Sequence, residues 1–426
     1  MNLIRINVKT REEKVACLFF PIVMIDYYLI MRGYNYNIIL MMPIVAFITL
    51  FCIKPLIDGV ASRNAGIRLI TVWLIYNLLS YIFIIGNNIE TECFTSRIRT
   101  YLFPILFFYF GINVNFSETK FYKSYLYSMI FCFLVGFYLY FFTPSYYTDY
   151  LLRVRENTWY MGDTYHTAET IMEHIRFGSF FSDSYAISYF SVPSLILSFS
   201  FILKKSESNY IRLWYFIALI SFAAALLCQQ RIAMSLSIAI VLFFSIRGIR
   251  YNNKMLAAIF GAAGALFIFA IVTFLDADRL SVITEMIFGR FEHMHFNEAM
   301  DARTGQYTGI WSSWNNIVFG DGLGSHSGVA MMYGHKVVND GEFIRVLVEN
   351  GIVGILIFVF MILKSLIRAY RLRRWLLPES LIVLYFLAAC IGSDALSIMF
   401  FYTPIFWFCL GRIWNNEYIS NLKTEN

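Results

Sequence analysis

Charged residues are scarce in this sequence. Only 15% of its 426 residues are Asp, Glu, Lys or Arg, whereas 59% are hydrophobic and 19% are aromatic. Soluble domains carry about 25% charged residues, so this composition excludes an ordinary soluble protein. Apolar runs of roughly 17 to 22 residues recur along the chain, and each is long enough to cross a hydrocarbon core about 30 Å thick as a helix. The sequence therefore predicts an all-α integral membrane protein.

The signals of several common site types are missing as well. Six of the seven cysteines lie in apolar runs and no CxxC pair occurs, which indicates neither a disulfide framework nor a cysteine metal site. His293 and His295 are the only closely spaced histidine pair and the HExxH motif is absent, so we expect no metal ion and no other cofactor. The glycine-rich run 320–324 lacks the GK[ST] ending of a nucleotide-binding loop. We also expect no nucleic-acid partner.

The topology follows from the apolar runs and from the basic residues around them. Basic residues precede the first apolar run and no small-residue cleavage site follows it, so we interpret this run as a retained first span rather than a secretion signal. With a cytoplasmic N-terminus, about twelve helices bring both termini to the cytoplasmic side. The expected spans are 15–31, 38–57, 67–86, 101–115, 124–142, 184–203, 211–228, 231–248, 255–275, 343–363, 380–395 and 397–413.

The positive-inside rule tests this arrangement, because short cytoplasmic connections carry an excess of Lys and Arg. Five clusters of basic residues fall on the predicted cytoplasmic side: Lys54/Arg63/Arg68, Lys120/Lys123, Lys204/Lys205/Arg212, Arg247/Arg250/Lys254 and Lys364/Arg368/Arg371/Arg373/Arg374. The opposite side receives two long loops, 143–183 and 276–342, which contain all six histidines. Neither loop reads as an independent domain, so residues 1–426 are expected to form one polytopic membrane domain.

The basic residues of the outer face are almost all arginines. A guanidinium is a planar donor that can hold phosphate oxygens with two parallel hydrogen bonds, whereas a lysine acts as a point charge. An arginine at a helix end can also extend its charge to the membrane surface without binding a ligand. Arg231 lies between two apolar runs with no Gly or Pro to make a turn. A charge there is expensive unless it faces a polar cavity, and a tight outer hairpin is the alternative interpretation.

The longest polar interruption of the apolar pattern runs from Arg303 to Gly354. Its glycine-rich run 320–324 can bring backbone N–H groups close to an anion, although such a run is also typical of a plain turn. Glu342, Arg345 and Glu349 are spaced i, i+3, i+7 and therefore share one helix face. They form either an ion ladder within the helix or an arginine and an acid at the mouth of the helix bundle.

Several side chains are candidates for catalytic proton transfer. His326 and His335 lie in the same polar stretch, and histidine is the side chain best suited to exchange protons near neutral pH. Asp340 and Glu342 stand at the entry to the next apolar run, where Asp340 is also a candidate helix cap. Asp183 precedes another span, and there an N-cap role is at least as good an interpretation as a catalytic one.

Three sequence blocks carry a family resemblance. They are RFGSFFSDS, which begins at Arg176; QQRIAMS, which contains Arg231; and FGDGLG, which is preceded by an arginine and tryptophans and followed by DGEFIRVLVENGIVG. In order and spacing these blocks resemble the motifs of the O-antigen polymerase and ligase superfamily, which includes the Wzy-type polymerases. The resemblance covers Arg176 to Phe360. It implies a GT-C-like helical bundle, a glycosyltransferase of lipopolysaccharide biosynthesis, with its active site on the periplasmic face of the bacterial inner membrane.

The resemblance also implies a substrate and a set of binding residues. The donor would be an undecaprenyl-pyrophosphate-linked glycan drawn from the membrane lipid, transferred with inversion at the anomeric carbon, and a chain-length regulator protein would be a further partner. By position, the outer-face arginines that would hold the pyrophosphate are Arg176, Arg231 and Arg303, with Arg345 as a fourth candidate. The base would come from the proton-transfer candidates above.

One departure from the family pattern bears on the type of enzyme. Where the family's ligases commonly have His-Asn ahead of the terminal L..E.G..G pattern, this chain has Asp340 and Gly341. The resemblance therefore favours a polymerase of repeat units over an O-antigen ligase that transfers the chain to lipid A core. A polysaccharide or lipid-carrier flippase is the other alternative. Transporter sites usually lie near the midplane between repeated halves, and no internal repeat is visible here.

Overall fold

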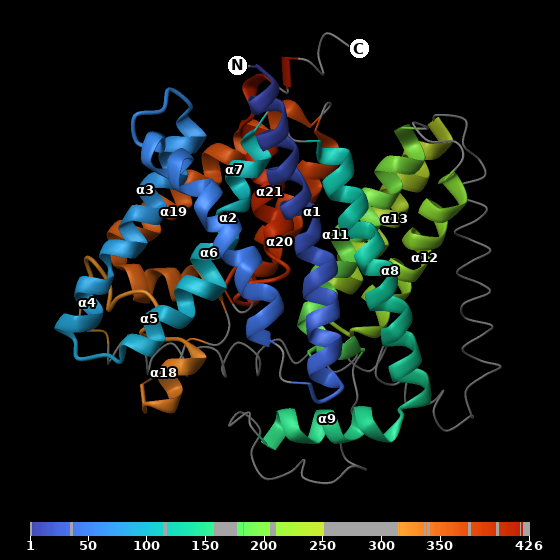
Figure 1. Ribbon diagram of the computed structural model, residues 1–426, viewed down its shortest axis with the longest axis horizontal. Helices are drawn as coiled ribbons and strands as arrows, with labels where there is room; N and C mark the ends of the chain where they lie inside the picture. Colours follow the sequence, from blue (N-terminus) through green and yellow to red (C-terminus); the bar gives the residue numbers. More distant parts are fainter. Residues whose placement is uncertain are drawn as a thin grey trace. The chain divides into compact units, whose positions relative to one another are not determined.

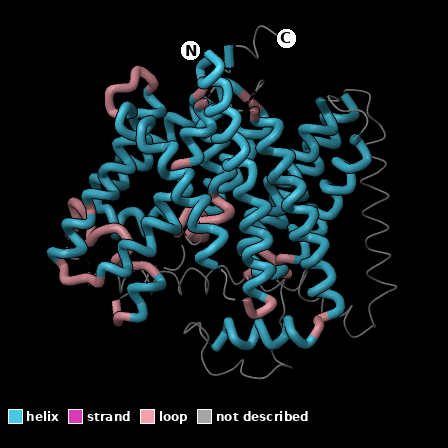
Figure 2. Tube along the Cα trace, viewed as in Figure 1, coloured by secondary structure: helices cyan, strands magenta, loops and turns pink. Residues whose placement is uncertain are grey.

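The computed structural model describes residues 2–34, 37–113, 117–156, 177–181, 183–204, 210–250, 314, 316–335, 338, 341–373, 376–397, 400–417 and 419–420. Every regular element within these ranges is helical (Figure 1, Figure 2). The expectation of an all-helical protein is therefore confirmed for the described part of the chain.

The contacts within the expected polytopic domain form two compact units. Unit 1 comprises Met1–Ala16, Pro43–Glu118 and His295–Asn426, and unit 2 comprises Cys17–Met42 and Thr119–Met294. The helices that lie mainly in unit 1 are α2 (Asn37–Gly59), α3 (Ala65–Leu79), α4 (Tyr81–Gly86), α5 (Thr91–Arg97), α6 (Phe103–Ile105), α7 (Phe107–Ile112), α18 (Gly328–Met332), α19 (Glu342–Leu372), α20 (Leu377–Gly392) and α21 (Pro404–Trp414). Those that lie mainly in unit 2 are α8 (Glu118–Phe142), α9 (Ser145–Glu156), α11 (Ser184–Lys204), α12 (Ile211–Leu227) and α13 (Arg231–Arg250), and α1 (Asn2–Met31) is divided between the two units at Ala16.

Six described helices are long and apolar enough to cross a membrane, and each coincides with an expected span. They are Glu13–Met31, Met42–Gly59, Ala65–Gly86, Thr119–Phe142, Ser184–Leu203 and Glu342–Leu372. Helices α12 and α20 are apolar but shorter, and α13 coincides with the expected span 231–248. The expected span 255–275 lies outside the described residues. These helices support a multi-pass membrane protein.

The expected span 101–115 is irregular in the structure. The π-helix Ile98–Leu102 is followed by α6 and then, after a turn at Leu106, by α7. Pro104 has no N–H to donate to the preceding turn, so it disrupts the hydrogen bonding that a regular α-helix would need at this point. The expectation of one uniform helix over these residues was wrong.

The expected span 397–413 is also shorter in the structure. Helix α21 begins only at Pro404 and contains 11 residues. Proline is favourable in the first helical turn, where no intrahelical donor is needed. Before it, the hydroxyl of Ser397 donates to Glu342 Oε2 at 3.1 Å, so this segment is drawn toward the start of α19 instead of continuing a straight helix.

Unit 2 contains a helix that the sequence did not indicate. Residues 145–156 of the expected outer loop 143–183 form α9, which runs across the end of α8 in Figure 1. The buried helix α11 packs against α12 and α13. Its serines satisfy their hydroxyl groups within the helix: Ser194 donates to the carbonyl of Phe190 and Ser198 to that of Ser194, both at 2.7 Å. The serines of this apolar helix are thus compatible with a buried position.

Paired glycines bring two helices of unit 1 together. A Cβ atom at Gly111 of α7 would lie 2.2 Å from the carbonyl oxygen of Phe408, and one at Gly411 of α21 would lie 2.3 Å from the carbonyl oxygen of Phe108. Small residues at such a crossing let the backbones approach closely, which is a common way to pack helices in membranes. This crossing helps to hold α21 in unit 1.

Candidate functional site

Helix α19 is interrupted within its membrane-spanning length. Gly351 has φ 66° and ψ −172°, outside the helical region, although the helix continues on both sides. A Cβ atom at this position would lie 2.4 Å from the backbone nitrogen of Gly320 and 2.4 Å from the carbonyl oxygen of Val318. Only glycine suits this position, because both the backbone conformation and the neighbouring loop exclude a side chain.

The glycine-rich loop fills the break. Loop and helix exchange four backbone hydrogen bonds: Asp321 N–H to Val348 O (3.1 Å), Gly322 N–H to Glu349 O (2.9 Å), Ile352 N–H to Ile317 O (3.0 Å) and Val353 N–H to Val318 O (3.1 Å). Tyr76 of α3 also donates its hydroxyl to the carbonyl of Asn350 at 2.6 Å. Backbone groups freed by the break are thus paired inside the protein, as unwound backbone at membrane depth requires. Two of the loop N–H groups therefore serve the helix rather than an anion.

Arg345, just before the break, is completely buried. Its Nη1 donates to Glu349 Oε2 at 2.7 Å and its Nη2 donates to Glu342 Oε1. The three side chains have 0% exposure, and the guanidinium carbon lies 4.9 Å from the centre of the Tyr101 ring. The geometry matches the ion-ladder interpretation of the i, i+3, i+7 spacing. In place of the pyrophosphate expected from the sequence, Arg345 holds two carboxylates of its own helix.

Two residues that the sequence analysis did not single out join this ladder. Arg97 of α5 donates from Nη1 to the carbonyl of Ser397 at 2.7 Å, and its Nη2 lies 3.8 Å from Glu349 Oε1. Asp394, which follows α20, is 5% exposed and interacts electrostatically with both arginines and both glutamates. An acid inside an apolar stretch was a signal for Asp394. The cluster, with two guanidiniums and three carboxyls, can be recognised only once these helices are packed together.

Both carboxylate oxygens of Glu342, a catalytic candidate, accept hydrogen bonds from other residues of the protein. The hydroxyl of Ser397 and the N–H of Leu396 donate to its Oε2 at 3.1 Å and 3.2 Å, while Arg345 occupies Oε1. Asp340 lies outside the described residues. The N-cap of α19 is Gly341, which offers no side chain for capping.

The two histidines of the loop have different environments. His326 Nε2 lies 3.0 Å from Asp321 Oδ2, and the two residues are 5% and 2% exposed. The N–H of Asn316 donates to the other carboxyl oxygen of Asp321 at 3.2 Å. This enclosed pair links the two ends of the glycine-rich loop, which indicates a role in holding the loop.

His335 is the accessible histidine. Its Nε2 lies 2.8 Å from Glu90 Oε2, and the side chains are 31% and 35% exposed. Glu90 precedes α5, so the pair joins two segments that are far apart in the sequence. The hydrogen bond with His335 lowers the pKa of the Glu90 carboxyl, which favours the carboxylate form of Glu90. A half-exposed imidazole oriented by a carboxylate is a suitable acid/base group.

This pair predicts a pH dependence of stability. Because the folded-state pKa of Glu90 is lowered, its contribution is complete above the ordinary glutamate value of about 4.3 and is lost as the pH falls through the lowered value. We expect Glu90→Gln to flatten the decline in thermal stability below about pH 4, measured by unfolding scans in detergent. Glu92→Gln, at an exposed acid two residues along the chain, is the control. Superimposable curves for the wild type and Glu90→Gln would contradict the assignment.

In unit 2 the segment around Arg231 forms a tight hairpin. Helix α12 ends at Leu227, Gln229 has φ 56°, and the exposed Arg231 begins α13. The side chain of Gln230 donates to Ser184 Oγ at 2.9 Å, and the N–H of Phe177 donates to the carbonyl of Leu227 at 3.3 Å. The residue that follows Arg176 is therefore anchored to the hairpin that carries Arg231. Two of the three motif blocks meet here.

Asp183 has the structural role that its position suggested. Its Oδ1 accepts a hydrogen bond from the N–H of Tyr185 at 2.8 Å at the start of α11, which confirms the N-cap interpretation. Arg176 and Arg303 lie outside the described residues. No protein-family model matches the sequence, and no curated protein matches it.

Proposed function

We propose that this chain is a glycosyltransferase that polymerises undecaprenyl-pyrophosphate-linked oligosaccharide repeat units into O-antigen or a similar surface polysaccharide, on the periplasmic face of the bacterial inner membrane. The His335–Glu90 pair is the observation that carries the proposal. It is an accessible acid/base pair at the end of a loop that is anchored in a broken membrane helix. The order of the three motif blocks and the apolar helices support the same function.

The proposed reaction is a single displacement. An acceptor hydroxyl gives its proton to His335, and its oxygen forms a bond to the anomeric carbon of the donor. The bond from that carbon to the pyrophosphate oxygen breaks, and the lipid pyrophosphate leaves with the electron pair, so the anomeric configuration inverts. Glu90 orients the imidazole and stabilises the imidazolium that forms, as a carboxylate does in related acid/base arrangements.

The leaving pyrophosphate gains negative charge and needs fixed positive groups. Preorganised guanidiniums in a partly dry site stabilise such a charge without reorganising during the reaction. The proposed pyrophosphate-binding residues are Arg176, Arg231 and Arg303, of which Arg231 is exposed at the first residue of α13. Arg345 is not among them, because it is buried between two glutamates.

The type of enzyme can be tested with membranes that contain the protein and lipid-linked repeat units alone. A polymerase should give a ladder of glycan lengths. A ligase should give no product until lipid A core is supplied, and a flippase should move the carrier lipid without changing glycan length. Either of the last two results would overturn the proposal.

The acid/base role predicts the effect of substitution at the pair. We expect His335→Asn to lower the polymerisation rate about 10²- to 10⁴-fold, the usual contribution of general acid–base catalysis, with little effect on donor binding. Glu90→Gln should give a smaller loss and shift the pH–rate profile. Glu92→Gln, which changes an exposed acid two residues after Glu90 in the first turn of α5, should remain fully active. Normal polymerisation by a folded His335→Asn variant would exclude His335 as the base.

A further inference from the structure

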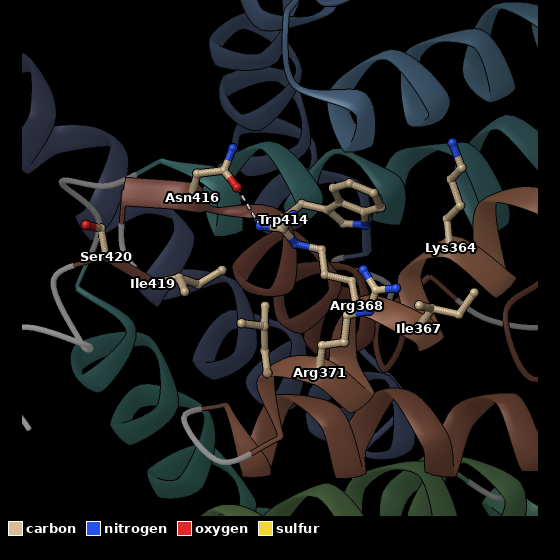
Figure 3. A pocket seen from close by; sticks show the side chains of 9 residues that line it. Lys364, Ile367, Arg368, Arg371, Trp414, Asn416, Ile419 and Ser420 are labelled. Carbon is tan, nitrogen blue, oxygen red and sulfur yellow. Dashed lines mark hydrogen bonds between the residues drawn. The ribbon is translucent and has the colours of Figure 1, made fainter.

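A groove lies at the end of α19 that is remote from the broken turn. It is formed by the last turns of α19, the end of α21 and the short helical segment that follows (Figure 3), and its volume is about 610 Å³. Nine residues line it, and those that matter for binding are Lys364, Ile367, Arg368, Arg371, Trp414 and Asn416. All belong to unit 1. The groove is separate from the residues assigned to glycan transfer.

The charge of the groove has one sign. Lys364, Arg368 and Arg371 are spaced i, i+4, i+7 on one face of α19, and none of the nine described lining residues is acidic. Lys364 and Arg371 are exposed, so their charges remain available to a ligand. A concave site whose described lining residues supply three cations attracts a negatively charged group.

The central guanidinium is held in place before any ligand arrives. Arg368 donates from Nε to the carbonyl of Ile413 and from Nη2 to Asn416 Oδ1, both at 2.5 Å. Its guanidinium carbon lies 4.9 Å from the centre of the Trp414 ring, and Figure 3 shows Trp414 and Asn416 beside it. A guanidinium has five N–H donors, so the two bonds leave donors for an anion. Because the Arg368 guanidinium is already fixed, it loses little conformational entropy when an anion binds.

The aromatic wall of the groove is also fixed. The indole N–H of Trp414 donates to Ser365 Oγ at 2.9 Å, and its backbone carbonyl accepts from Asn64 Nδ2 at 2.9 Å. A Cβ atom at Gly66 would lie 2.3 Å from the indole ring, so glycine there lets α3 close against the tryptophan. Tryptophan at this level of a membrane helix is typical of the lipid headgroup region.

Apolar side chains continue outward from the groove. Leu363 and Ile367 are each 52% exposed on the same end of α19. A free phosphate ion would make no use of them, whereas the acyl chains of a phospholipid would cover them. The positive-inside rule assigns this end of α19 to the cytoplasm, whereas Glu342 begins the opposite end of the helix. The lipid-linked glycan proposed as donor would act at that other end.

We infer that this groove binds the phosphate of an anionic glycerophospholipid, such as phosphatidylglycerol. The phosphate oxygens meet the free N–H groups of Arg368 and the charges of Lys364 and Arg371. The acyl chains lie along the exposed apolar face of α19. Such basic pockets beside membrane helices are suited to anionic headgroups, and each basic residue near the surface strengthens the attraction.

The test uses the purified full-length protein in neutral detergent. Short-chain phosphatidylglycerol, the matching phosphatidylcholine and inorganic phosphate are titrated separately, and the rise in unfolding temperature is followed. Only phosphatidylglycerol should stabilise the protein with a saturable dependence. The double variant Lys364→Gln/Arg371→Gln should weaken its apparent affinity on the order of 25-fold, about fivefold for each charge.

A matched control removes two charges outside the groove. Arg63→Gln/Arg373→Gln changes two exposed arginines of the same unit, and neither residue lines the groove. This variant should bind phosphatidylglycerol within about twofold of the wild type. Equal weakening in both double variants would show a diffuse charge effect and overturn the inference. Equal stabilisation by phosphatidylcholine, or by inorganic phosphate at the same concentration, would also overturn it.

Discussion

Gly351→Ala should lower the free energy of unfolding by about 3 kcal/mol or more, because a non-glycine residue in this backbone region is strained and its Cβ has no space. The Cβ would lie 2.4 Å from the backbone nitrogen of Gly320 and 2.4 Å from the carbonyl oxygen of Val318. Both of these neighbours are backbone atoms, which cannot turn aside as a flexible side chain can. The loop would have to withdraw, which would leave carbonyls at the break without partners. The measurement is unfolding in mixed detergent micelles, together with the yield of folded protein.

Gly328→Ala is the matched control for this prediction. Gly328 begins α18, no atom lies within 4 Å of the position a Cβ would take, and its φ is not positive. The control should change the free energy of unfolding by less than about 0.5 kcal/mol. If Gly351→Ala were as stable as Gly328→Ala, the glycine-rich loop would not be the element that completes the broken helix.

Arg345→Ala should be the other large loss, about 3–5 kcal/mol in the free energy of unfolding. Removing one partner of a buried ion pair leaves the other charge without compensation, and here two glutamates with 0% exposure would lose their guanidinium. Arg373→Ala should cost less than about 1 kcal/mol, since an exposed arginine contributes little. Unfolding of purified variants in detergent gives both values.

A compensating variant separates buried charge from substrate binding. Replacing the ladder by Glu342→Gln, Arg345→Met and Glu349→Gln together should recover much of the stability that Arg345→Ala alone loses, because no ladder carboxylate remains unpaired. If Arg345→Ala instead kept wild-type stability but no longer bound the lipid-linked donor, the assignment of Arg345 to the buried ladder would be wrong. The sequence-based expectation of a pyrophosphate contact would then be favoured.

The sequence alone determined the features that depend on local pattern. Apolar runs of spanning length located six helices, because the thickness of the hydrocarbon core sets a length that can be read from the residues. The i, i+3, i+7 spacing of Glu342, Arg345 and Glu349 is enough by itself to place them on one face of a helix. The N-cap role of Asp183 was likewise available from its position at the start of a span.

Only the tertiary structure decided what these groups do. The glycine-rich loop was open to interpretation as an anion cradle, and its role became clear only when its N–H groups were found on the carbonyls of α19. Glu90 and His335 form a pair although 245 positions separate them in the sequence. No local sequence pattern predicts a contact between residues so far apart in the chain. Arg97 and Asp394 reach the ion ladder in the same way. Local spacing fixes which face of a helix a residue occupies, whereas the identity of its partner depends on how distant segments pack.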